Sequence, residues 1–198
     1  YQNILTNSKY GPQAECGKPV IYLYPAATTS VSVGVDADIK KSEPLYHNGW
    51  RVIATPQGTI IQNGETYDYL FWDGYGNGLY PKLTEGVVVP TNKALDTMAE
   101  NLRVMGFIEP EIDDFIDFWK DYLPSKPYTR ISWITTEGME GLAKLFISPR
   151  PDTLFRAFVD FEGLDEFITL DPQQLPQHKR EGFVVTEWGG LLRHNVKN

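Results

Sequence analysis

The sequence predicts an α+β protein with an antiparallel β-sandwich or barrel-like core and an inserted two-helix hairpin. Short apolar segments with the alternation typical of strands, separated by Gly, Pro and Asp, occupy both ends of the chain. The apolar spacing changes to that of helices between residues 93 and 123. Aromatic residues make up 13% of the chain, with five Trp and eleven Tyr, and favour strands around a ring-filled core.

The first strands are predicted within residues 16–90. In KPVIYLYP (18–25) the apolar residues follow one another between two prolines, which is typical of a short strand buried on both faces. Valines alternate with small residues over 30–35, as in a half-exposed strand. Residues 50–62 have the pattern of a hairpin around a Pro-Gln-Gly turn, and YDYLFW (67–72) continues as a further strand. These segments predict an antiparallel β layer.

A helical hairpin is predicted next. Thr91 or Asn92 suits the N-cap of the first helix, and Gly106 suits its end. Pro110 suits the first turn of the second helix, which ends before Pro124. That first turn carries four carboxylates: Glu109, Glu111, Asp113 and Asp114. Because the helix dipole favours anions there, we interpret the cluster as structural rather than as a metal or basic-partner site.

Strand patterns resume after the hairpin. The segments are TRISWIT (129–135), LAKLFISP (142–149), LFRAFVDF (154–161), EFITL (166–170) and GFVVTEWGG (182–190). A polar, proline-bearing loop, DPQQLPQHKRE, lies before the last of them. At 198 residues we expect a loose N-terminal arm over 1–15 and a single globular domain over 16–198.

Composition excludes several classes of partner. A net charge of −8 argues against nucleic acid, which requires a basic surface. No apolar run approaches the 18 residues of a transmembrane helix.

Cys16 is the single cysteine of the sequence, and we interpret it as a small buried residue, an intermolecular disulfide partner or a reactive thiol. The three histidines, His47, His178 and His194, are far apart in the sequence, so we expect no metal site and no cofactor.

Standard catalytic motifs do not occur in the sequence, which has no P-loop, no H-E-x-x-H and no G-x-S-x-G. The stretch DGYGNG (73–78) resembles a phosphate or calcium loop only superficially. No helix follows it to face an anion, and Thr84 stands where a calcium loop needs a bidentate Glu. We interpret it as a glycine-rich connection between strands.

Two carboxylates beside tryptophan remain as candidate catalytic residues. Asp73 follows Trp72, and Glu187 precedes Trp188. Paired carboxylates with aromatic platforms are typical of glycosidases, which makes Asp73 and Glu187 acid/base candidates and the two tryptophans candidate binding residues. Arg156 is a third candidate binding residue. In the structural alternative, the carboxylates point away from the tryptophans. Arg156 then forms an ion pair with Glu137, Asp160 or Glu187.

Eight ordered blocks of the sequence resemble a family of uncharacterised bacterial proteins. The blocks are CGKPVIYLYP, TTSVSV, NGWRV, YLFWDG, EGVVVP, MGFIEPEIDDFIDFW, PDTLFRAF and GFVVTEWGG. They extend over roughly residues 16–190. The resemblance implies an intact domain and an extracytoplasmic location, either secreted or attached to the cell envelope. It implies no activity, cofactor or catalytic residue.

The sequence leads to three hypotheses about function. The first is a non-catalytic module of the cell exterior that binds a protein partner, a glycan or another copy of itself. The second is a hydrolase of extracellular polysaccharides that uses Asp73 and Glu187 as its carboxylates. The third is a structural subunit of an assembly, in which the N-terminal arm pairs with a neighbouring sheet edge.

Overall fold

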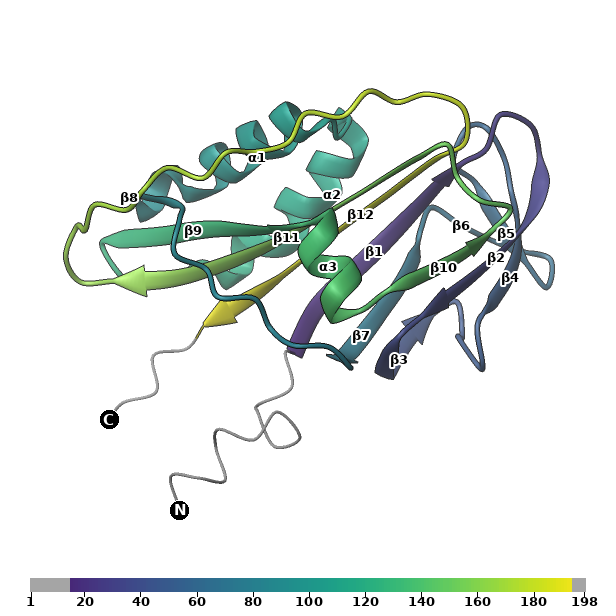
Figure 1. Cartoon of the computed structure of the whole chain (residues 1–198), viewed down its shortest axis with the longest axis horizontal. Coiled ribbons are helices and arrows are strands. Elements are labelled where there is room, and N and C mark those ends of the chain that lie inside the picture. Colours follow the sequence, from purple (N-terminus) through teal and green to yellow (C-terminus); the bar gives the residue numbers. More distant parts are fainter. Residues whose placement is uncertain (1–14, 194–198) are drawn as a thin grey trace, which may run out of the picture.

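The computed structural model describes residues 15–193 of the chain and confirms the α+β class (Figure 1). Over this range two β-sheets pack face to face, and a helical hairpin covers the outer face of the larger sheet. The large sheet has seven strands among these residues, in the spatial order β3 (Ala37–Glu43), β7 (Leu70–Gly76), β1 (Glu15–Tyr24), β12 (Val184–Arg193), β11 (Thr153–Leu164), β9 (Tyr128–Thr135) and β8 (Val87–Pro90). The small sheet, over the same range, has five, in the order β10 (Leu145–Ser148), β2 (Thr29–Val35), β4 (Trp50–Ala54), β5 (Ile60–Gln62) and β6 (Glu65–Tyr67).

Strand β1 lies near the middle of the large sheet and buries both of its faces. Ile21 and Leu23 point into the core between the two sheets, and both are fully buried. Val20 and Tyr22 point into the second core, beneath the helices. This confirms the strand with two buried faces that was predicted from KPVIYLYP, and it places one face of β1 against the helical hairpin.

The helical hairpin predicted for residues 93–123 is confirmed. It consists of α1 (Ala94–Met105) and α2 (Glu109–Trp119), and the 3₁₀ turn η2 (Lys120–Tyr122) follows. The buried residues recur at helical spacing, and they pack on the outer face of the large sheet. They are Ala94, Met98, Ala99, Leu102 and Met105 in α1, and Glu111, Ile112, Phe115 and Trp119 in α2.

The first helix starts differently from the prediction. The 3₁₀ turn η1 (Thr91–Lys93) precedes α1, and neither Thr91 nor Asn92 caps it. The hydroxyl of Thr91 instead donates a hydrogen bond to the carbonyl oxygen of Lys126 at 2.6 Å. At the other end of α1, Gly106 has a φ of +102°, the left-handed conformation expected of a helix stop.

Helix α3 (Thr136–Leu142) and strand β3 are among the elements that were not predicted, because their local signal is weak. The helix α3 is seven residues long and contains two glycines, so its sequence shows no repeated helical period. It is held by Met139 and Leu142, which are buried in the core between the sheets. Strand β3 is polar and lies at the edge of the large sheet, where it pairs with β7 alone and needs no apolar pattern of its own.

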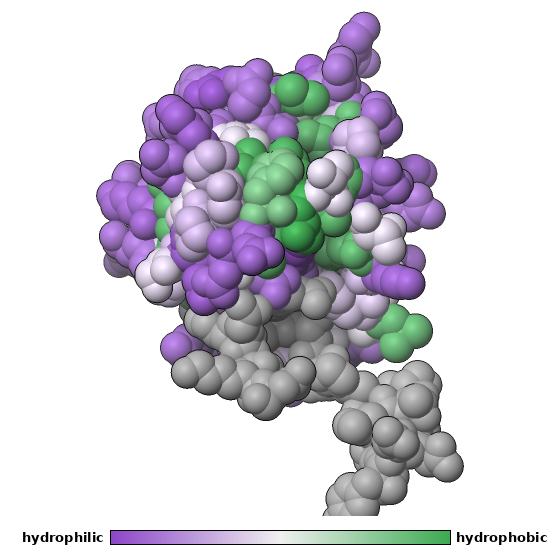
Figure 2. Space-filling model, turned by 90° about the vertical axis from the view of Figure 1, so that its left-hand side faces the viewer, coloured by the Kyte–Doolittle hydropathy of each residue, from purple (hydrophilic) through white to green (hydrophobic). Residues whose placement is uncertain are grey.

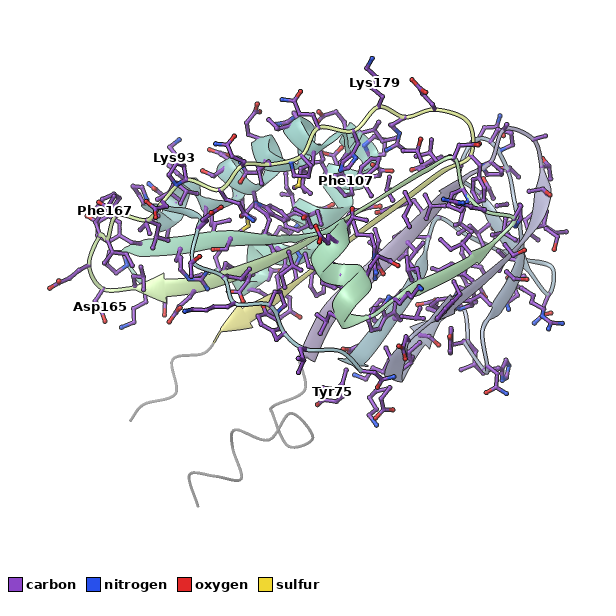
Figure 3. The ribbon with its side chains drawn as sticks, in the orientation of Figure 1. Tyr75, Lys93, Phe107, Asp165, Phe167 and Lys179 are labelled. Atoms are coloured by element: carbon purple, nitrogen blue, oxygen red, sulfur yellow. The ribbon has the colours of Figure 1, made fainter. Side chains whose placement is uncertain are left out.

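The pairing of β11 with β12 is parallel, whereas the other strand pairs of the described sheets are antiparallel. A parallel pair needs a long connection, and residues 165–183, which we name the crossover segment, provide it. Figure 3 shows Phe167 at one end of this segment and Lys179 toward the other. The strand predicted at 166–170 is therefore wrong, because these residues belong to the crossover segment and form no regular strand.

Three side chains are among those that hold the crossover segment on the domain. The amide of Gln173 accepts a hydrogen bond from Trp133 N at 2.8 Å and donates one to Trp133 O at 2.7 Å, as a neighbouring strand would. The ring of His178 stacks on Phe155, with centroids 4.8 Å apart. Arg180 forms an ion pair with Glu111 of α2 at 3.0 Å.

Some predictions fall outside the described residues. The loose arm predicted for residues 1–15 lies there except for Glu15, which begins β1. Self-association through that arm, the state of the Cys16 side chain and the surroundings of His194 also stay predictions. Within residues 15–193, no helix has the length and apolar character needed to cross a membrane, and no group of three or more His, Cys, Asp or Glu side chains is placed to hold a metal ion.

Candidate functional site

Glu187, one of the two candidate catalytic carboxylates, is fully buried in an ion pair. It lies on β12, and its Oε2 accepts a hydrogen bond from Arg156 Nε at 2.6 Å. Its Oε1 accepts one from Trp72 Nε1 at 2.9 Å. Arg156 also donates from Nη1 to Glu140 at 2.8 Å and to the carbonyl of Ala143 at 2.7 Å. The structure thus joins three of the predicted site residues in one interior network.

Burial raises the pKa of Glu187, and the positive charge of Arg156 opposes that shift. The network lies beside the core between the two sheets, where Trp72 is fully buried. Breaking a buried pair of this kind leaves an uncompensated charge, so its main effect is on stability. Of the three partners predicted for Arg156, the structure shows Glu187. It also shows Glu140, which was not predicted.

Asp73 does not face Glu187. Along β7, Trp72 points into the core between the sheets, and the adjacent Phe71 packs against the core beneath the helices. Alternation along the strand places Asp73 on the same side as Phe71, opposite to the face that holds Glu187. The two carboxylates therefore lie on opposite faces of the large sheet, and no single glycosidic bond can lie between them.

The two candidate aromatic platforms are interior residues. Trp72 and Trp188 are both fully buried, Trp72 between the sheets and Trp188 beneath the helices. Trp188 Nε1 donates a hydrogen bond to the hydroxyl of Tyr22 at 3.2 Å. Neither indole offers a surface to a ligand, but Trp188 supports a tyrosine that does border a surface groove.

The groove runs along one side of β1, beneath α2, and we name it the β1–α2 groove. It consists of two adjoining cavities of about 370 and 350 Å³ that share Asp114. The first cavity is lined by Lys18, Tyr69, Asp114, Asp117, Phe118, Asp121 and Tyr122. The second is lined by Tyr22, Tyr24, Gln57, Gly58, Thr59, Asp68, Pro110, Asp113 and Asp114. The lining therefore combines aromatic rings with carboxylates.

Three tyrosines form a continuous set of rings in this groove. Tyr22 and Tyr24 are two residues apart on β1, so they share a face, and their rings are nearly parallel with centroids 6.4 Å apart. The ring of Tyr69 meets Tyr22 edge-on at 5.7 Å. Gly58 has a φ of +91°, and a Cβ there would come within 2.7 Å of the Tyr24 ring. A glycine at this turn is therefore needed to leave the ring in place.

Three tyrosine hydroxyls of the groove have a raised pKa. Burial is the largest cause that raises the pKa of Tyr22, Tyr24 and Tyr69, and nearby carboxylates add to it. The hydroxyl of Tyr22 donates a hydrogen bond to Asp114 Oδ2 at 2.8 Å. The same hydroxyl accepts a hydrogen bond from Trp188 Nε1, so the two hydrogen bonds together orient the carboxylate of Asp114, which both cavities share.

A second surface feature is an apolar patch at the end of the molecule that bears β8. Figure 2 shows hydrophobic residues gathered at the centre of this face, with polar residues around them. Val87, Phe167 and Ile168 are exposed there, at 38%, 57% and 44%. They border a cavity of about 250 Å³ between β8, β9 and the crossover segment. This patch is far less polar than the β1–α2 groove and suits a different kind of contact.

Prediction from sequence missed the groove for two reasons. Its residues come from five segments, namely β1, the turn between β4 and β5, residues 68–69, α2 and η2. Their convergence depends on how α2 crosses β1, which no local pattern reveals. One signal was present: KPVIYLYP places Tyr22 and Tyr24 on a single face of a strand, and the acidic first turn of the second helix lies beside them.

Comparison with known proteins gives one informative similarity. The chain is 44% identical over 62 residues to an "Uncharacterized protein in bglA 3'region" of Butyrivibrio fibrisolvens. The alignment covers 29% of this chain and 65% of that protein, so the chain matches just under two thirds of the relative's length. No family model matches the chain. No solved structure matches it either.

Proposed function

We propose that the protein is a non-catalytic binding module that holds a glycan in the β1–α2 groove. The observation that carries this proposal is that aromatic rings and carboxylates line two adjoining cavities together, with Asp113, Asp117 and Tyr122 exposed. Ring faces pack against the apolar faces of sugar rings, and carboxylates accept hydrogen bonds from hydroxyl groups. The proposed setting is the cell exterior, secreted or attached to the envelope, as the family resemblance implies.

The presence of two adjoining cavities supports an extended ligand. Lys18 lines the first cavity and Tyr24 the second, and both lie on β1. A ligand that occupies both cavities is longer than a single monosaccharide. The proposal also agrees with the interior positions of Glu187 and Arg156, which are both buried and do not line the groove.

Binding of soluble oligosaccharides, measured by isothermal titration calorimetry, tests the proposal. Replacing Tyr69 or Tyr122 with Ala should weaken binding about tenfold, because each change removes a ring from the first cavity. Phe167→Ala is the matched control, since it removes an exposed ring from the apolar patch instead. The proposal fails if no oligosaccharide binds, or if the groove variants bind as tightly as the control.

A further inference from the structure

Asparagine is followed directly by glycine at three places in the sequence, and the structure gives these places different surroundings. The pairs are Asn48-Gly49, Asn63-Gly64 and Asn77-Gly78. In such a pair the backbone nitrogen of the glycine can attack the side-chain amide carbon of the asparagine, because glycine has no Cβ that hinders the approach. In a folded chain, this attack requires a glycine N–H and an asparagine side chain that are both free to move.

At Asn77 both reacting groups are bound. Its Nδ2 donates a hydrogen bond to Asp36 Oδ1 at 2.7 Å. The N–H of Gly78 donates one to the carbonyl oxygen of Leu142 at 2.8 Å. The backbone is also tightly packed here, since a Cβ on Gly78 would lie 1.8 Å from the carbonyl oxygen of Gly141. Two hydrogen bonds must therefore break before Asn77 reacts.

At Asn48 one reacting group is bound. The side chain of Asn48 is exposed, but the N–H of Gly49 donates a hydrogen bond to the carbonyl oxygen of Tyr46 at 2.8 Å. The glycine nitrogen must leave this hydrogen bond before it attacks.

At Asn63 both reacting groups are free. Asn63 and Gly64 form the two-residue turn between β5 and β6, with φ angles of +54° and +86°, and the pairing of Gln62 with Glu65 closes it. Both turn residues are exposed. Within residues 15–193, neither the side chain of Asn63 nor the N–H of Gly64 forms a hydrogen bond. A Cβ on Gly64 would meet no atom within 4 Å, so there is room for a new ring.

We propose that Asn63 is a site of spontaneous deamidation. The nitrogen of Gly64 gives its proton to a base in the solvent and attacks Cγ of Asn63. The side-chain nitrogen leaves as ammonia, and a succinimide ring remains. A water molecule from the solvent then adds to one of the two ring carbonyls and opens the ring, which gives aspartate or isoaspartate without any oxidation or reduction.

The modification alters the hairpin that carries it. Isoaspartate adds one carbon to the main chain, so the turn no longer has the length that a two-residue connection requires. Strand β6 is three residues long and lies at the edge of the small sheet, where its described pairing is with β5. We therefore expect isoaspartate at Asn63 to loosen β6 and to speed amide hydrogen exchange at Tyr67.

Mass spectrometry of the full chain tests the proposal. The chain is incubated at mildly alkaline pH, and fragment ions of its peptides show which asparagine has been converted; methylation by an isoaspartate methyltransferase is an independent assay. Each hydrogen bond that must break slows the reaction about fivefold. We thus expect Asn48 to react about fivefold and Asn77 about thirtyfold more slowly than Asn63.

Two controls show whether the structure sets this order. In urea the three pairs lose their different surroundings and should react at similar rates. Asp36→Ala removes the acceptor of the Asn77 side chain. It should speed the reaction of Asn77 about fivefold and leave that of Asn63 unchanged.

Three results would overturn the proposal. The first is an Asn63 that reacts no faster than Asn77 in the folded chain. The second is an Asn63 that reacts readily in urea alone, because the hairpin would then protect it. The third is the same order of rates in urea as in the folded chain, because neighbouring residues in the sequence would then set that order.

Discussion

Glu187 and Asp73 are both carboxylates next to tryptophan, yet the structure gives them opposite surroundings. Glu187 is fully buried against Arg156 and Trp72, whereas Asp73 is partly exposed on the other face of the sheet. Replacing Glu187 with Gln removes the charge that compensates Arg156. We expect Glu187→Gln to lower the free energy of unfolding by about 3 kcal/mol, measured by urea denaturation.

Asp73→Asn makes the same chemical change at the partly exposed position. It should alter the free energy of unfolding by less than about 0.5 kcal/mol. Equal effects of the two substitutions would show that the Arg156–Glu187 pair is not what stabilises this region.

His178 predicts a pH dependence of stability. Partial burial against Phe155 lowers the pKa of its imidazole below 6.5. As the pH falls through 6.5, the unfolded chain binds the proton before the folded chain does, so stability decreases between 6.5 and the folded-state pKa. Melting temperatures of the wild type between about pH 7.5 and 5.5 should fall more steeply than those of His178→Gln. Parallel curves would contradict this assignment.

Sequence reasoning at this scale gave the relative orientation of neighbouring residues but not their surroundings. Alternation along a strand correctly implies that Glu187 and Trp188 face opposite ways. It does not say which of the two faces the helices. That depends on the order of strands in the sheet, and β12 pairs with β1 and β11, which lie far from it in the sequence.

The crossover segment is held against β9 by the side chain of Gln173. The amide of Gln173 takes both backbone hydrogen bonds of Trp133, on β9. Gln173→Ala leaves that N–H and C=O without this partner, which should cost about 1–3 kcal/mol. Amide hydrogen exchange should then show faster exchange at Trp133 than in the wild type.

The adjacent Gln174 is exposed and is the natural control. Gln174→Ala should leave exchange at Trp133 unchanged, because it removes a side chain from the same segment without touching β9. Comparable acceleration in both variants would mean that the crossover segment is held by other contacts.

Elements whose apolar residues recur at regular spacing were predictable from the sequence. Elements that are stabilised mainly by contacts with neighbouring elements were not. The helical hairpin and strand β1 have apolar patterns that specify both their type and their burial. The helix α3 and strand β3 lack such patterns, since one is short and the other lies at a polar edge. The parallel pairing of β11 and β12 was missed because alternation does not encode the direction of a neighbour.

At the scale of the molecule, the large sheet is shared by two cores. One lies between the sheets and the other beneath the helices, and β1 contributes side chains to both. This predicts a single cooperative unfolding transition, in agreement with the single domain expected from the sequence. Leu23→Ala in one core and Leu102→Ala in the other should each lower the same transition, by about 2–5 kcal/mol.

Differential scanning calorimetry checks this. The calorimetric and van't Hoff enthalpies should agree in the wild type and in both variants. Two separate transitions, each sensitive to only one of the substitutions, would show that the layers unfold independently.

The pairing of β1 with β12 also bears on how the domain folds during synthesis. Tyr22 and Trp188, which share a hydrogen bond across this pair, are 166 residues apart in the sequence. Until β12 has left the ribosome, β1 has a partner on only one of its two edges, where β7 lies. The large sheet therefore stays open beside β1 until the last described strand is made, and contacts of such long sequence separation favour slow folding.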